Sequence, residues 1–275
     1  MSYRTLLVHA DAAASADARI AFAAAFALRH DAHLVGIVPT GILRYLYGAA
    51  PDGYFGDATP LFEGLRAAAE QGAARFDALA RQSGLTVFEH RITDEEAGYA
   101  LATQGMCADL LIVGQSDPGD PATAHAAIPE YAALHAPCPV LVLPYAGRFA
   151  PDFERILVAW NGSPQAARAL REAMPLLESA GAVEVAVFGS AEAGARAPGG
   201  PDVAQFLARH RVKVTLWQQA MPDDVGDALL SRVNDTRAEL LVTGCYGHTR
   251  IREIVLGGVS RTVLRSMTVP TLMAH

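Results

Sequence analysis

Short apolar runs alternate along the chain with longer stretches in which apolar residues recur every three or four positions. In the C-terminal half, the apolar runs of strand length cover residues 155–160, 183–189, 212–217, 239–244 and 270–274. The stretches with helical spacing cover residues 164–180, 201–211, 222–236 and 258–266. Strands that alternate with helices predict right-handed βαβ units. We therefore expect an α/β fold whose mainly parallel sheet is covered by helices on both faces.

The helix predicted after the strand 155–160 carries its own start and stop signals. Ser163 is placed to cap the amino end, Pro164 suits the first turn, and Gly181 follows the end. Pro175 lies inside the helical pattern, where a proline removes a backbone hydrogen bond. The sequence therefore predicts a kink near Pro175.

The pattern occurs twice. Three segments of the first half line up with three of the second: Arg4–Asp11 with Arg155–Gly162, Ala108–Gln115 with Ala238–Cys245, and Cys138–Pro144 with Val269–His275. Their order and spacing match, which predicts two copies of one domain, residues 1–147 and 152–275, joined by a stretch that contains Pro and Gly. Each copy is expected to form an open, doubly wound, parallel sheet of five strands.

The first copy carries an addition between its second strand and the helix near Leu61–Gln82. Residues 40–60 contain several aromatic residues and glycines without a clear period. We interpret them as an inserted loop or lid. A surface loop packed by its own aromatic side chains is the simpler alternative, and a role in covering a site or binding a partner stays open.

Composition narrows the class of protein. The formal charge of −7 at pH 7 argues against non-specific nucleic-acid binding, which needs a basic face. None of the apolar runs approaches the roughly 20 residues of a membrane span, and the N-terminus lacks the pattern of a signal peptide. Cys107, Cys138 and Cys245 suggest neither a disulfide framework nor a zinc site. We expect a cytoplasmic protein.

A glycine motif follows the fourth strand of the second copy. It comprises Gly244 and Gly247, then Gly257 and Gly258, with Val259 and Ser260 opening the next helix. In open α/β sheets, ligands bind beyond the carboxyl ends of the strands. Glycines let backbone N–H groups approach an anion, and a helix amino terminus offers unpaired donors. The motif is consistent with phosphate binding, although a tight turn remains the alternative; it matches neither a Walker loop nor the GxGxxG fingerprint.

The spacing Gly-x2-Gly-x9-Gly at this place, the following helix and the Pro-led last strand resemble the universal stress protein family. The opening "ILVAWNGSPQAARAL" (156–170) also resembles the family's first strand and turn. The resemblance covers nearly all of the chain as two tandem copies and implies a Rossmann-like, adenine-nucleotide α-hydrolase-like fold. It further implies that the second copy binds an adenine nucleotide, ATP in the first place or else ADP or AMP, with Mg²⁺ as a companion of the nucleotide left open.

The resemblance also assigns the binding residues. Asn161 would contact the base or ribose, and the end of the second strand at Val187 would flank the adenine. The full expected set is Trp160, Asn161, Val187, Gly244, Gly247, His248, Gly257, Gly258, Val259 and Ser260. Two positions depart from the family pattern, since Gly258 stands where Ser or Thr is usual and Asn161 where Asp is common. A hydrogen bond to a charged group is typically worth ~1.5–3 kcal/mol, so weaker binding is expected rather than none.

The first copy has a different sequence at the same place. After Gly114 it lacks the second glycine and the glycine pair, and Asp117 and Asp120 put negative charge where phosphate would lie. We therefore expect the first copy not to bind ATP. His9 ends the first strand and faces the corresponding place, where it is a candidate ligand contact.

No catalytic or metal-binding residue is predicted. The nine histidines form no HExxH motif or Cys/His cluster, and there is no GxSxG elbow. The sequence offers no acidic cluster for Mg²⁺ and no base aimed at the phosphates. These observations favour a nucleotide-binding regulatory protein of the stress response, with at most weak ATP hydrolysis. A slow ATPase and a structural stress protein without nucleotide are the alternatives.

Two further expectations concern assembly and thiol chemistry. The resemblance implies that the two copies pack as an intramolecular pseudo-dimer near their last strands, and a homodimer of two chains is a further option. Cys245 lies within the glycine loop, where it is either an inert small residue or a thiol activated by nearby charge.

Overall fold

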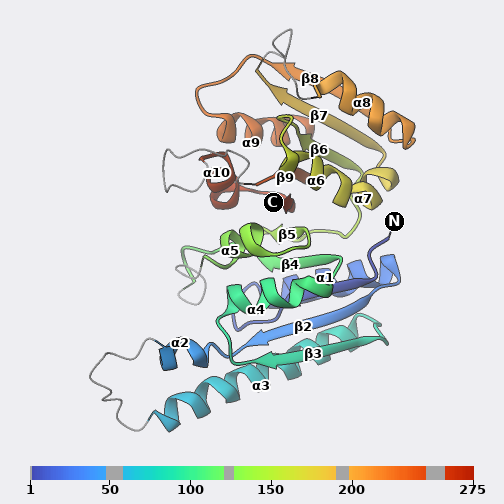
Figure 1. Ribbon diagram of the computed structural model, residues 1–275. Coiled ribbons are helices and arrows are strands. Elements are labelled where there is room, and N and C mark those ends of the chain that lie inside the picture. Colours follow the sequence, from blue (N-terminus) through green and yellow to red (C-terminus); the bar gives the residue numbers. More distant parts are fainter. Residues whose placement is uncertain (1, 48–57, 121–126, 190–197, 246–257) are drawn as a thin grey trace. The chain divides into compact units, whose positions relative to one another are not determined.

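The computed structural model describes residues 2–47, 58–120, 127–189, 198–245 and 258–275. The protein is of the α/β class, as predicted, with strands and helices alternating along the chain (Figure 1). Its contacts divide it into two compact units. The N-terminal unit comprises Tyr3–Ala132 with Ala136–Cys138, and the C-terminal unit consists chiefly of Pro139–His275 with Ala133–His135.

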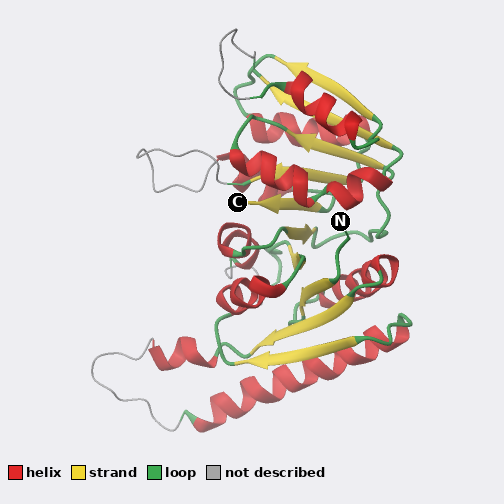
Figure 2. Cartoon of the chain, turned by 45° about the vertical axis from the view of Figure 1, so that its right-hand side comes forward, coloured by secondary structure: helices red, strands yellow, loops and turns green. Residues whose placement is uncertain are grey.

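The N-terminal unit is built on a parallel sheet in the order β3-β2-β1-β4. Its strands are β1 (Thr5–His9), β2 (His33–Pro39), β3 (Phe88–Thr93) and β4 (Leu110–Gly114). Its helices are α1 (Ala16–His30), α2 (Ile42–Tyr47), α3 (Thr59–Gln82), α4 (Ala97–Gln104) and the first part of α5 (Ile128–His135), with a short 3₁₀ turn at Gly105–Cys107. Helices α1 and α3 cover one face of this sheet and α4 lies on the other (Figures 1 and 2).

The C-terminal unit contains a sheet in the order β5-β10-β9-β6-β7-β8. Its strands are β5 (Val140–Leu143), β6 (Arg155–Ala159), β7 (Ala182–Phe188), β8 (Val214–Gln219), β9 (Leu240–Gly244) and β10 (Thr271–Ala274). Its helices are α6 (Pro164–Glu172), α7 (Met174–Ser179), α8 (Gly200–Arg209), α9 (Val225–Thr236) and α10 (Gly258–Ser266). Helices α6, α7 and α8 lie on one face, and α9 and α10 lie on the other (Figure 1).

Strand β5 departs from the expected plan of five parallel strands in each copy. It comes from the first sequence copy, yet it belongs by its contacts to the C-terminal unit, where it pairs antiparallel with β10. Leu141 lies opposite Leu272 in this pairing. The apolar pattern predicts that a segment is a strand, but it does not name the strand's partner. The intramolecular pseudo-dimer stays a prediction.

The start of α6 confirms the predicted capping. The Ser163 hydroxyl accepts a hydrogen bond from the Ala166 N–H at 3.1 Å, which satisfies one of the unpaired donors of the first turn. The predicted kink is also confirmed, since α6 ends at Glu172 and α7 begins at Met174, directly before Pro175.

The central strands are buried on both faces, as their continuous apolar runs predict. Leu110–Val113 of β4 and Leu240–Val242 of β9 have no exposed surface. Each of these strands therefore runs through a buried core to the carboxyl edge of its own sheet. In the C-terminal unit the glycine motif begins at this edge.

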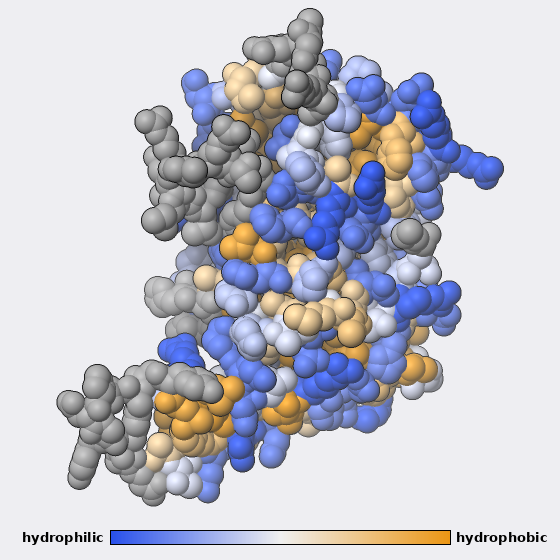
Figure 3. All heavy atoms as spheres, in the orientation of Figure 1, coloured by the Kyte–Doolittle hydropathy of each residue, from blue (hydrophilic) through white to orange (hydrophobic). Residues whose placement is uncertain are grey.

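The predicted insertion, residues 40–60, is only partly described, because residues 48–57 lie outside the described part. The described start forms α2, whose backbone is tied to the turn after β3: Gly41 N–H donates to Glu95 O at 3.1 Å and Leu43 N–H to Asp94 O at 2.9 Å. Leu46 of α2 and Leu61 of α3 are exposed. Figure 3 shows apolar side chains at the surface in this region. Whether the insertion covers a site stays open.

The two copies align one residue differently from the sequence comparison. Asp109 accepts hydrogen bonds from the N–H groups of Arg4 and Thr5, and Glu239 accepts them from Glu154 and Arg155. Strand pairing agrees, since Leu6 lies opposite Leu110 and Ile156 opposite Leu240.

This register makes Thr5, rather than Arg4, the counterpart of Arg155. The sequence similarity pairs the two arginines because they are identical residues, whereas backbone pairing fixes the register. Asp11 is therefore the counterpart of Asn161, and Ala10 is the counterpart of Trp160. The first copy therefore has a carboxylate at this place, where the second has an amide.

Candidate functional site

The predicted site lies at the carboxyl edge of the C-terminal sheet. Strands β6, β7 and β9 end there at Ala159, Phe188 and Gly244, and α10 begins at Gly258. Asn161 follows β6 and is exposed. Its side-chain oxygen accepts the Ser163 N–H at 3.1 Å, which fixes the turn, and its amide N–H donors have no partner among the described residues. The amide can therefore donate to a ligand oxygen.

Gly244 is required by packing. A Cβ at this position would lie 2.6 Å from the carbonyl carbon of Gln165 and would also collide with the backbone of Ala166. The end of β9 thus touches the first turn of α6 with no room for a side chain. Because Gly244 has no side chain, the carboxyl end of β9 can pack directly against the first turn of α6.

Trp160 and Val187 lie together beside the start of α8. The Trp160 indole donates a hydrogen bond to Pro198 O at 3.0 Å, and only 7% of this residue is exposed. A Cβ at Gly200 would lie 3.1 Å from a methyl group of Val187. The amino end of α8 therefore covers both side chains.

The far end of the motif opens α10. Gly258 is exposed, with open space where a Cβ would be, whereas Ser260 is buried. A side chain at position 258 would meet no obstacle among the described residues. Gly247, His248 and Gly257 lie outside the described residues, so their expected roles remain predictions.

Cys245 is an inert residue rather than an activated thiol. It has no exposed surface, and its thiol donates to Ala133 O at 3.0 Å. Burial raises the pKa of this thiol to about 12, and the more distant charge of Arg168 only partly offsets that effect. Since the thiolate is the reactive form, this side chain serves packing at the start of the glycine loop.

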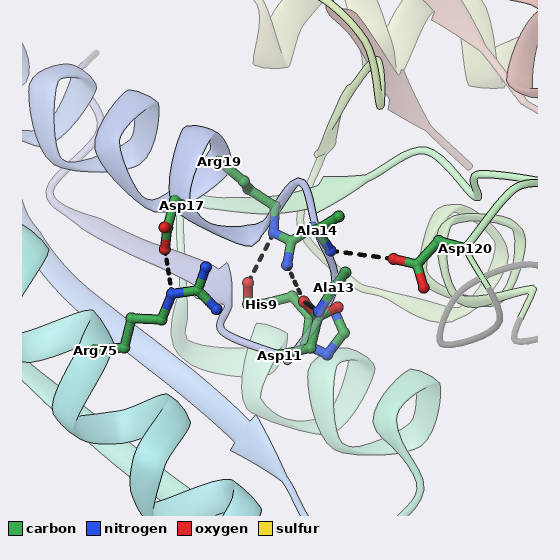
Figure 4. A network of polar contacts seen from close by, with 8 residues as sticks. All are labelled: His9, Asp11, Ala13, Ala14, Asp17, Arg19, Arg75 and Asp120. Atoms are coloured by element: carbon green, nitrogen blue, oxygen red, sulfur yellow. Dashed lines mark hydrogen bonds and ion pairs between the residues drawn. The ribbon is translucent and has the colours of Figure 1, made fainter.

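The corresponding edge of the N-terminal unit holds a charged cluster that the sequence analysis missed (Figure 4). Arg19 of α1 is buried, with only 3% of it exposed. Its Nε donates to His9 O at 2.8 Å and its Nη2 to the Asp11 carboxylate at 2.6 Å. The other oxygen of Asp11 lies 3.1 Å from His9 Nδ1. These contacts bind the three side chains into one network.

Charges and burial set the titration of this network. Burial lowers the pKa of His9 to about 4, an effect that the nearby Asp11 opposes and Arg19 reinforces. Burial alone would raise the pKa of Asp11, but His9, Arg19 and the Ala13 N–H together lower it to about 2. At neutral pH the network therefore contains a neutral imidazole and a buried ion pair between Asp11 and Arg19.

The fold has relatives among solved structures. A universal stress protein from Archaeoglobus fulgidus DSM 4304 is similar over 98% of this chain and 95% of its own, with a TM-score of 0.72 at 14% identity. A putative universal stress protein from Pseudomonas aeruginosa UCBPP-PA14 is similar over 99% and 93%, with a TM-score of 0.61 at 18% identity. At these identities the likeness establishes the fold, an open α/β sheet of the Rossmann-like kind.

The model of the universal stress protein family matches residues 152–275, the segment that carries the glycine motif. No curated protein matches the chain.

The described residues also bear on membrane insertion and on metal binding. None of the described helices is both long enough and apolar enough to cross a membrane. Within the same residues, no group of three or more His, Cys, Asp or Glu side chains is arranged to hold a metal ion.

Proposed function

We propose that this chain is a universal stress protein, a regulatory protein that binds an adenine nucleotide, in the first place ATP, at the carboxyl edge of its C-terminal unit. The observation that carries the proposal is the position of the glycine motif. It connects the end of β9 to the start of α10, within a half that matches the family. This edge is where open α/β sheets bind ligands.

The described residues are compatible with that ligand. Gly258 leaves the amino end of α10 open, and the free amide of Asn161 lies at the turn after β6. A helix amino terminus attracts phosphate through its unpaired N–H groups and its dipole. We assign the phosphates to the start of α10 and the ribose or base to the side of Asn161.

A gain-of-function variant tests the site most sharply. Gly258→Ser restores the hydroxyl that the family usually carries, in space that no described residue fills, and should tighten ATP binding about tenfold or more, since a hydrogen bond to a charged group typically adds ~1.5–3 kcal/mol. Isothermal titration with ATP, ADP, AMP and cyclic AMP measures the affinity. Gly64→Ser is the matched control, because Gly64 of α3 also has open space around it and lies in the other unit.

Loss-of-function variants complete the test. Gly247→Val and Gly257→Val should abolish binding, because a branched side chain would keep the loop backbone from the phosphates. No heat of binding with the wild-type protein and no nucleotide retained on purification would disprove the proposal. Steady ATP hydrolysis that disappears in both variants would favour a slow ATPase instead.

A further inference from the structure

The loop after β4 places a carboxylate on the turn between β1 and α1 of the N-terminal unit. Asp120 accepts a hydrogen bond from the Ala14 N–H at 3.1 Å (Figure 4). Ala14 lies two residues before α1, whose cap residue Ser15 makes no side-chain cap. A carboxylate here interacts with the positive end of the helix, as a bound anion does. The loop that follows β9 in the C-terminal unit is the one that we expect to hold phosphate.

The space beneath this turn is filled as well. The Arg19 guanidinium takes the room that the missing Cβ of Gly114 leaves, so its Nη1 contacts this glycine. In the C-terminal unit the backbone of α6 contacts Gly244 instead, and the counterpart of Arg19 is Ala169, which has no exposed surface. In the first copy a buried guanidinium therefore lies where the second copy has a direct contact between helix and strand.

The acid of the turn is also fully engaged. Asp11 accepts from Arg19 at 2.6 Å and from the Ala13 N–H at 3.0 Å, and its second oxygen faces His9. Its counterpart Asn161 is exposed, and its N–H donors have no partner among the residues that the structure describes. One oxygen of Asp11 accepts both the Arg19 and the Ala13 hydrogen bonds, and a ligand hydroxyl would have to compete with the buried imidazole of His9 for the other.

We propose that the N-terminal unit contains a ligand site that the chain has closed with its own side chains. The Asp120 carboxylate occupies the anion position at the β1–α1 turn, and Arg19, Asp11 and His9 fill the space beside it. The chain consequently binds nucleotide at one site only. That count rests on the proposed function, whereas the occupied anion position does not.

Anion rescue tests the closed site without any nucleotide. Asp120→Ala removes the internal carboxylate and should lower the Tm by about 2–4 °C in phosphate-free buffer, the size expected for losing one anion at a helix start. Inorganic phosphate, added at constant ionic strength, should restore most of that loss. The Tm of the wild-type protein should respond less to phosphate, because its N-terminal anion position is already filled and only the proposed C-terminal site can bind the ion.

Asp117→Ala is the matched control. Asp117 lies in the same loop, and its carboxylate accepts the Gly119 N–H within that loop. This variant should be destabilised without regaining stability in phosphate. If Asp120→Ala does not fold, Asp120→Ser shortens the side chain and removes the charge, and it should show the same phosphate response.

Two results would overturn the proposal. One is an Asp120 variant whose Tm is no more sensitive to phosphate than that of Asp117→Ala. The other is ATP-dependent protection of residues 10–16 against hydrogen exchange in the wild-type chain, which would mean that the N-terminal site is open. Absence of ATP binding at the C-terminal unit would leave the phosphate result unchanged, so failure of the proposed function is distinguished from failure of this proposal.

Discussion

The two units place different side chains at the same point of the same fold. In the N-terminal unit the turn after β1 carries Asp11, which is locked to the buried Arg19 and faces His9. In the C-terminal unit the turn after β6 carries the exposed Asn161, whose side-chain oxygen accepts the Ser163 N–H. In the N-terminal unit the protein's own side chains satisfy the polar groups at this edge. In the C-terminal unit the amide donors of Asn161 have no partner among the described residues and can serve a ligand. In a duplicated fold the same sheet edge thus stabilises one copy, and in the other it is the edge to which we assign ligand binding.

The largest effect that would test this comparison is expected at Asp11. Asp11→Ala leaves the Arg19 guanidinium buried without a counter-charge, and the unfolding free energy of the N-terminal unit should fall by about 3–5 kcal/mol. Chemical denaturation, with hydrogen exchange of the β1 amides as the readout, measures this loss of unfolding free energy. Arg66→Ala, which breaks the exposed Arg66–Asp94 pair, should cost less than about 1 kcal/mol. Equal costs would contradict a buried lock.

Acidification should lower the stability of the N-terminal unit, relative to the C-terminal unit, by almost as much. The pKa of His9 is lowered from 6.5 to about 4 in the folded protein, so the unfolded chain takes up a proton first as the pH falls. The N-terminal unit should therefore lose about 3 kcal/mol between pH 7 and pH 4. His9→Ala, which copies the counterpart Ala159, should remove that part of the loss. An unchanged acid sensitivity in this variant would assign the loss to other groups.

Glycine substitutions should show a smaller contrast. Gly244→Ala forces a Cβ against the backbone of α6 and should destabilise the C-terminal unit by about 1–3 kcal/mol. Gly114→Ala meets the end of the Arg19 side chain and should cost less, because a side chain moves more readily than a helix backbone. Gly258→Ala lies in open space and should be nearly neutral. Urea denaturation of the three variants provides the ranking, and the reverse order for Gly114 and Gly244 would refute it.

The smallest expected effect concerns the amide itself. Asn161→Asp replaces the amide N–H donor by a carboxylate oxygen, to which a ribose hydroxyl can turn and donate. ATP binding should tighten about fivefold, since a hydrogen bond to a charged group gains roughly 1 kcal/mol over one to a neutral amide. Calorimetric titration measures the change. Asn234→Asp adds the same charge on α9 of the same unit and should leave the affinity unchanged. Weaker binding by Asn161→Asp would place the phosphates, rather than the ribose, beside this turn.

Several local features followed directly from the sequence. The Ser163 cap and the helix break before Pro175 were predicted because each depends only on neighbouring residues. Arg19 was missed, although a signal was present. It lies on the same helix face as Ala16 and Ala23, both of which are buried, and a charged residue on an apolar face points to an internal partner.

The sequence by itself determined the α/β class, the duplication and the position of the glycine motif, because these depend on periodicity and spacing along the chain. Only the tertiary structure decided that Asp11, rather than Ala10, is the counterpart of Asn161, since register is fixed by backbone pairing between distant strands. It also decided that β5 pairs with β10 and that Arg19 reaches Asp11 beside Gly114. Contacts between segments far apart in the chain leave no periodic trace, so only the folded chain reveals them.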